Sequence, residues 1–136
     1  MRQSVVSVSL LFVLAGCDPG GSMERRELAS HETAAIIDVA DINKAQAAYY
    51  GRTSKYAANL SELCASVNGP SRRICRGEVH GYVFTVASSS PSDGYAIDAR
   101  PKTPGSSGRR FFYSDQTTII RHSESGPANA NIPVLP

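Results

Sequence analysis

Residues 22–51 constrain the fold of this chain more than any other stretch. Side chains recur along one side in steps of three, four or seven, and neither Pro nor an internal Gly interrupts the run. This stripe comprises Leu28, Ala35, Val39, Ile42, Gln46 and Tyr49, with Ile36, Ala40, Ala47 and Tyr50 beside it. The spacing predicts one amphipathic helix roughly 40 Å long, with Ser22 as N-cap and Gly51 at its end. Such a helix must bury its stripe against a sheet or another helix.

The other side of this helix is expected to face solvent. Its polar residues are Arg25, Arg26, Glu32, Asp38, Asp41 and Lys44. Asp38 and Asp41 lie three residues apart and therefore share a face. This spacing is more typical of a solvated helix flank than of an acid/base pair.

Residues 1–17 have the pattern of an export signal. Arg2 precedes an apolar run of about ten residues, which suits the core of a signal peptide and is too short to span a bilayer. The run ends in Leu14-Ala15-Gly16-Cys17, which resembles the lipobox of bacterial lipoproteins. We therefore expect a signal peptide at 1–16, diacylation of Cys17, and an anchor made of acyl chains such as palmitate. The alternative is an ordinary secretory signal with an unmodified thiol.

The residues after Cys17 bear on location. Asp18 resembles the signal that retains lipoproteins in the inner membrane of enteric bacteria, so the inner membrane is favoured. Residues 17–22 are expected to form the lipidated Cys and a short flexible tether. The protein is thus predicted to lie in the cell envelope, lipid-anchored and facing the periplasm.

Composition narrows the class of protein further. About 120 residues follow the signal, which is enough for one domain. With 14 basic against 12 acidic residues and no Trp, nothing favours nucleic-acid binding. In an exported protein, Cys64 and Cys75 are expected to form a disulfide. A metal or redox pair is the poorer alternative, because the spacing is not C-x-x-C and His80 is the only His nearby.

The second half of the chain changes its hydrophobic period to two. Asn59 and Glu62 predict a short capped helix near Leu60 and Leu63. Strands are then expected at 82–87, 95–100, 109–114 and 118–122, with short connections that force antiparallel neighbours. The predicted fold class is α+β: a long N-terminal helix packed on an antiparallel sheet of about four strands, spanning 23–122. Residues 123–136 are expected to be a loose C-terminal tail.

This order of parts resembles the globular domain of type IV pilins and type II secretion pseudopilins. Residues 42–50, 56–57 and 60–63 are similar to the helix end and following loop of such proteins, and 81–86, 94–97 and 104–115 are similar to their strands. The resemblance implies a pilin-like domain that binds a protein partner or assembles near a pilus or secretion apparatus. It does not extend to the N-terminus, where a lipobox replaces the prepilin cleavage site and apolar helix. Some pseudopilins bind calcium through clustered acids, but Asp93, Asp98 and Asp115 are scattered, so no metal site is carried over.

No arrangement of residues predicts catalysis. His31, His80 and His122 occur in unrelated contexts and are expected to be exposed surface residues. We expect no catalytic residue, no cofactor, no metal and no identifiable small-molecule substrate. The predicted function is non-enzymatic binding or assembly; the alternative is a small periplasmic ligand-binding protein or enzyme, which would need a deep pocket with converging polar residues.

Two groups of arginines are candidate partner-binding residues. Arg72, Arg73 and Arg76 lie in or beside the expected disulfide loop, and Arg109, Arg110 and Arg121 lie on expected neighbouring strands. Either group could dock an acidic partner, since Arg is favoured at interfaces. The second group could instead cover the solvent face of the sheet with its aliphatic stems.

Overall fold

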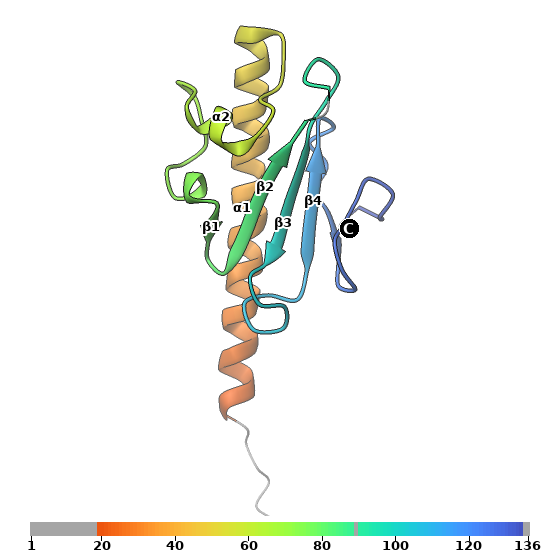
Figure 1. Ribbon diagram of the computed structural model, residues 1–136. Coiled ribbons are helices and arrows are strands. Elements are labelled where there is room, and N and C mark those ends of the chain that lie inside the picture. The colour runs from red at the N-terminus through yellow and green to blue at the C-terminus, as the bar shows by residue number, and fades with distance from the viewer. Residues whose placement is uncertain (1–18, 89, 135–136) are drawn as a thin grey trace, which may run out of the picture.

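The computed structural model describes residues 19–88 and 90–134. Its long helix α1 (Pro19–Thr53) lies along one face of an antiparallel sheet, as Figure 1 shows. Between them in sequence come α2 (Leu60–Cys64) and the 3₁₀ turn η1 (Ile74–Arg76). The strands are β1 (Glu78–Val79), β2 (Tyr82–Ala87), β3 (Ala96–Pro101), β4 (Phe111–Asp115) and β5 (Arg121–Ser123), in that spatial order. The predicted α+β class is confirmed, with five strands in place of about four.

Helix α1 is longer at both ends than expected. It begins at Pro19, so Ser22 lies inside the helix and is not its N-cap, and residues 19–22 are not a coil tether. A Pro is favoured in the first turn of a helix, where a missing N–H is not needed. Gly51 does not end the helix either. The helix ends after Thr53, where Ser54 adopts a left-handed backbone with φ of 56°.

The apolar stripe of α1 packs as predicted. Ala35, Val39 and Ile42 are fully buried and belong to one core cluster with inward-facing residues of β2, β3 and β4. Those residues are Tyr82, Phe84, Val86, Ile97, Ala99 and Phe112. Full burial of a Val, Ile or Phe side chain contributes about 1.5–3 kcal/mol, so this cluster stabilises the packing of helix on sheet.

Two carboxylates on the predicted solvent side of α1 are in fact buried. Glu32 is 8% exposed and Asp38 is 0% exposed. Two polar residues are buried as well, Gln46 within the stripe and Asn43 beside it. Asn43 bonds Tyr95 and Ser114, and Gln46 bonds both the N–H and the C=O of Ala57. Buried polar groups need partners, and each of these four residues finds one in a different segment. The expectation of a wholly solvated flank is therefore wrong.

The segment after α1 confirms several local predictions. Cys64 and Cys75 are joined by a disulfide, with 5.8 Å between their Cα atoms. Asn59 caps α2 by accepting the N–H of Glu62 at 2.8 Å. Leu63 of α2 is fully buried. Figure 1 shows α2 and η1 beside α1, at one edge of the sheet.

The C-terminal segment is not loose over the part that the structure describes. Val134 pairs with Arg121 of β5, and the Arg121 guanidinium donates to the Ile132 carbonyl at 2.6 Å. Ala128 is only 4% exposed. Residues 123–134 therefore fold back along β5 and beside the sheet.

Candidate partner-binding surface and cavities

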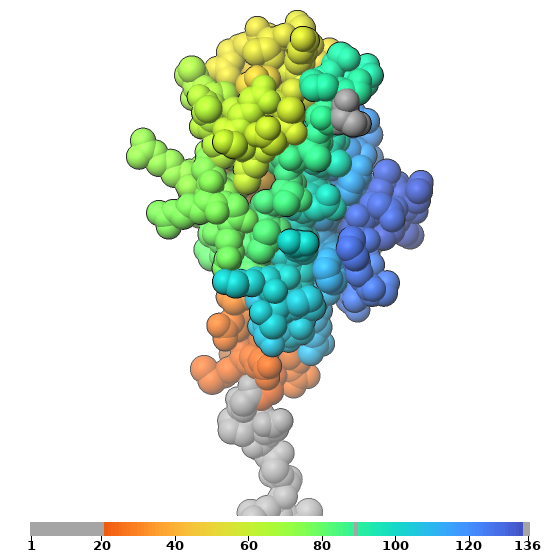
Figure 2. Space-filling view, in the orientation of Figure 1, coloured from red at the N-terminus to blue at the C-terminus, as the bar shows by residue number. Residues whose placement is uncertain are grey.

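The first arginine group lies on a segment that is fastened in three places. Arg72, Arg73 and Arg76 are all exposed, and the Cys64–Cys75 disulfide closes this segment. Asp41 of α1 accepts the N–H of Ser71 at 3.0 Å, a contact that ties the loop to the helix. Figure 2 shows this region, coloured green, projecting from the left edge of the molecule. We call residues 64–76 the basic loop.

Asp38 provides the third attachment. Its Oδ1 accepts from the Arg73 guanidinium at 2.9 Å, and its Oδ2 lies 3.7 Å from Nδ1 of His80 without a hydrogen bond. His80 stands in the turn between β1 and β2, with φ of 51°. One buried carboxylate thus faces two cationic or potentially cationic residues from the basic loop and the sheet. Charge pairing of this kind is what permits a carboxylate to be buried.

This arrangement divides the first arginine group into two roles. Arg73 is held by Asp38, whereas the guanidinium groups of Arg72 and Arg76 have no partner among the described residues. Val67, at the other side of the basic loop, is 90% exposed. It lines a hollow of about 420 Å³ between the loop and α1, together with Asp41, Lys44, Ala45, Ala48, Asn68 and Gly69. The basic loop therefore presents two unpaired positive charges and an exposed apolar side chain.

The second arginine group does not converge. Arg109 and Arg110 precede β4 and are not part of it, and Arg121 lies on β5. Arg110 turns toward α1, where its Nε donates to Glu32 at 2.7 Å and its guanidinium lies 5.5 Å from the Phe112 ring centre. Arg121 is paired with the C-terminal segment. The predicted strand position is confirmed for Arg121 and wrong for Arg109 and Arg110. Of these three arginines, only Arg109 has an exposed side chain without a partner in the described chain.

Glu32 accepts hydrogen bonds from the two residues that precede β4. One oxygen accepts the backbone N–H groups of Arg109 at 2.8 Å and Arg110 at 3.2 Å, while the other accepts Nε of Arg110. Burial by itself raises the pKa of Glu32, but these hydrogen bonds and the Arg110 charge outweigh it, so the pKa lies below the ordinary value of 4.5. Glu32 and Arg110 form a structural clamp.

The three histidines differ in exposure. His80 is exposed as expected, whereas His31 and His122 are half-buried. Nδ1 of His31 lies 3.1 Å from the Ser107 carbonyl, and Nδ1 of His122 is buried without a hydrogen-bond partner. Within the described residues, no group of three His, Cys, Asp or Glu side chains could hold a metal ion. No helix in residues 19–88 and 90–134 is long and apolar enough to cross a membrane.

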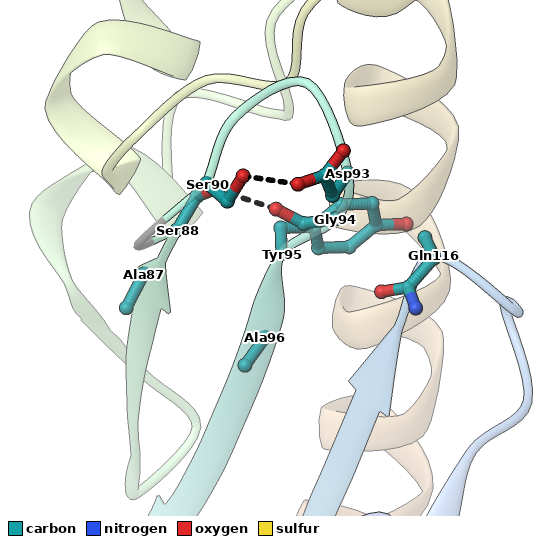
Figure 3. A pocket seen from close by; sticks show the side chains of 8 residues that line it. All are labelled: Ala87, Ser88, Ser90, Asp93, Gly94, Tyr95, Ala96 and Gln116. Carbon is teal, nitrogen blue, oxygen red and sulfur yellow. Dashed lines mark hydrogen bonds between the residues drawn. The ribbon is translucent and has the colours of Figure 1, made fainter.

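The turn between β2 and β3 encloses an open hollow of about 420 Å³, drawn in Figure 3. Ser88, Ser90, Asp93, Tyr95 and Gln116 contribute its side-chain polar groups. The Ser90 hydroxyl donates to the Asp93 carboxylate, and the Ser88 hydroxyl donates to the Gly94 carbonyl at 2.5 Å. These groups stabilise the turn, and the Tyr95 hydroxyl donates to Asn43. Among the described residues that line the hollow, Gln116 is then the one whose polar side chain has no partner.

The predicted lipidation site, Cys17, and the predicted signal peptide lie outside the described residues. The arginines of the basic loop were predicted from sequence, but the role of Asp38 as its anchor was not.

Comparisons of the chain with protein-family models, with curated proteins and with solved structures each find no match.

Proposed function

We propose that this protein is a lipid-anchored envelope protein whose pilin-like domain binds or assembles with another envelope protein, near a pilus or secretion apparatus, and catalyses no reaction. The support for an anchor is the Leu14-Ala15-Gly16-Cys17 sequence directly after an apolar run. The support for a pilin-like domain is the order of parts, a long helix followed by an antiparallel meander.

The basic loop is the observation that carries the binding role. Arg72 and Arg76 are exposed, unpaired within the described chain, and mounted on a segment held by a disulfide and by two carboxylates of α1. A surface that is already fixed loses little conformational entropy on binding. Two free guanidinium groups favour an acidic partner through charge complementarity and bidentate hydrogen bonds to carboxylates.

The position of the basic loop along α1 sets a geometric condition. Helix α1 begins two residues after Cys17, and Asp38 lies nineteen residues further along. At 1.5 Å per residue this places the loop about 30 Å from the start of the helix. If Cys17 carries the acyl chains and α1 stands upright on the bilayer, the acidic surface of the partner lies at about that height.

Crosslinking in intact membranes followed by pull-down tests the proposal. Four forms are compared: the unaltered protein, Cys17→Ser, Arg72→Glu with Arg76→Glu, and Arg26→Glu with Lys55→Glu as a matched charge reversal elsewhere on the surface. We expect one envelope protein to be recovered with the unaltered and matched-reversal forms. Its yield should fall with Cys17→Ser and with the loop reversal.

Two results would count against the proposal. Equal recovery with the loop reversal would remove the basic loop from the interface. Recovery of no envelope protein, together with export of a Cys17→Ser form that fractionates like the unaltered protein, would reject both the anchor and the partner.

A further inference from the structure

A third hollow lies on the outer face of the sheet, the face turned away from α1. Its volume is about 230 Å³, and its side chains come from three strands and the C-terminal segment. These are Thr85 of β2, Asp98 and Arg100 of β3, Phe111 of β4, and Pro127 with Ala128. Figure 2 shows this outer face toward the viewer, with the C-terminal segment in dark blue along its edge. We call it the outer pocket.

Strand pairing holds the polar side chains of the outer pocket in place. Thr85 is paired with Asp98, and Asp98 is paired in turn with Tyr113, so these three side chains form a row across one face. Arg100 lies two residues after Asp98 on β3, and Phe111 lies two residues before Tyr113 on β4, so both share that face. The far wall is also fixed, because Ala128 is 4% exposed and Arg121 bonds the same segment at Ile132. The pocket is therefore built on the sheet and not on a loop tip.

Asp98 is the exception among the buried and half-buried carboxylates. Glu32, Asp38 and Asp115 each accept at least one hydrogen bond, from Arg110, Arg73 and Thr117 respectively. Half-buried Asp98 has no hydrogen-bond or ion-pair partner in the part of the chain that the structure describes. Burial of an unpaired carboxylate is unfavourable. A carboxylate that is partly buried, unpaired and placed in a hollow is a candidate for pairing with a ligand.

The groups around Asp98 do not supply a positive charge that pairs with its carboxylate. Arg100, on the same strand, attracts the carboxylate but is exposed and forms no ion pair with it. Tyr113, on β4, directs its hydroxyl to Asp115 at 3.4 Å. Strand β2 contributes Thr85, whose hydroxyl has no partner among the described residues, and the C-terminal segment contributes the uncharged Pro127 and Ala128. Burial raises the pKa of Asp98 above its ordinary value, and Arg100 only partly opposes this.

We propose that the outer pocket binds a primary ammonium group on a short apolar stem. The ammonium donates to the Asp98 carboxylate and to the Thr85 hydroxyl, and the stem packs on the Phe111 ring and on Pro127. At about 30 Å³ for each water-sized unit, the pocket holds roughly eight non-hydrogen atoms. Arg100 at its edge disfavours a second positive charge on the ligand. This inference goes beyond partner binding by the basic loop and does not depend on the lipid anchor.

Two sources share this chemistry: a free small amine, and the lysine side chain of a partner protein. The probes are therefore n-butylammonium chloride and N-acetyl-lysine N-methylamide, with n-butanol as the neutral control. Amide chemical shifts of the isotope-labelled protein are followed during each titration. We expect saturable shifts at Thr85, Asp98, Phe111 and Ala128 with both ammonium probes, and none that saturates with butanol.

Substitutions then test the residue that carries the proposal. Asp98→Asn keeps the shape and removes the charge, so binding of butylammonium should weaken at least about tenfold, the equivalent of one lost charge-assisted hydrogen bond. Thr85→Val should weaken binding by a smaller factor. Glu124→Gln, which removes an exposed acid outside the pocket, should leave the affinity unchanged.

Each outcome of these titrations either supports or overturns the proposal. Tighter binding of the peptide-like probe assigns the pocket to a lysine of a partner, and tighter binding of butylammonium assigns it to a free amine; both support the proposal. Saturation by butanol with equal affinity, equal binding by a folded Asp98→Asn variant, or the absence of any saturable shift at the pocket residues would overturn it.

Discussion

Replacing Glu32 by Gln measures how strongly α1 stabilises the position of Arg109 and Arg110, which precede β4. The carboxylate accepts three hydrogen bonds, at 2.8 Å and 3.2 Å from the backbone N–H groups of Arg109 and Arg110 and at 2.7 Å from Nε of Arg110. Gln keeps one acceptor oxygen but turns an NH₂ group toward a donor. At least one charge-assisted bond is lost, so the free energy of unfolding should fall by about 2–3 kcal/mol near neutral pH.

The pH dependence separates charge from shape in this experiment. Because the pKa of Glu32 is lowered in the folded protein, its stabilisation is fully present above the unfolded value, near 4.5, and is lost as pH falls through the folded pKa. In strong acid the unaltered protein carries a neutral Glu32 and resembles the Gln variant. The deficit of Glu32→Gln should therefore shrink as the pH is lowered from about 7 to about 3.

Urea unfolding followed by circular dichroism provides the assay. For a domain of this size, a deficit of 2–3 kcal/mol moves the midpoint by about 1–2 M urea. Glu24→Gln is the matched control: Glu24 lies exposed on the same helix, and its substitution should change stability by less than about 0.5 kcal/mol. The reasoning is refuted if Glu32→Gln is as stable as the unaltered protein at neutral pH, or if its deficit is the same in acid.

Three further predictions concern other parts of the structure. Replacing Cys64 and Cys75 together by Ala should lower the free energy of unfolding by about 3 kcal/mol in the chain-entropy model; an unchanged thermal midpoint would contradict this. Gln46→Ala leaves the buried N–H and C=O of Ala57 without their side-chain partner and should cost about 2–4 kcal/mol by urea unfolding, whereas a loss below 1 kcal/mol would show that water replaces the amide. Because burial raises the pKa of Asp98, its charge destabilises the folded state above the folded pKa and has no effect below the unfolded value, near 3.8. Asp98→Asn should thus raise the thermal midpoint near neutral pH but not in strong acid, and a lower midpoint near neutral pH would count against this account.

Local patterns determined a large share of the fold. The repeat of three and four in α1 and the period of two in β2 and β3 are properties of the chain itself, and short connections leave antiparallel pairing as the available arrangement. The Asn59 cap and the Cys64–Cys75 disulfide likewise join residues close in sequence, twelve or fewer positions apart. These features were predictable because the residues that interact lie close together in the sequence.

The boundaries of β4 show where local reasoning stops. A strand was expected over residues 109–114, but the N–H groups of Arg109 and Arg110 donate to Glu32, a residue more than seventy positions earlier. A donor committed to a carboxylate is not free for a strand ladder, so β4 begins at Phe111. The same contact explains why Glu32 is buried, although the charged residues on its side of the helix predicted that this side faces solvent.

The sequence by itself determined the helix stripe, the meander of strands and the disulfide, because these follow from periodicity and from short separations along the chain. Lipidation of Cys17 also rests on sequence, and it stays a prediction. Tertiary structure alone decided which acids are buried, which arginines stay free, and that the C-terminal segment walls a pocket around Asp98. The physical reason is that the burial of a charge depends on the partner brought to it from elsewhere in the chain, and no helical or strand period contains that information.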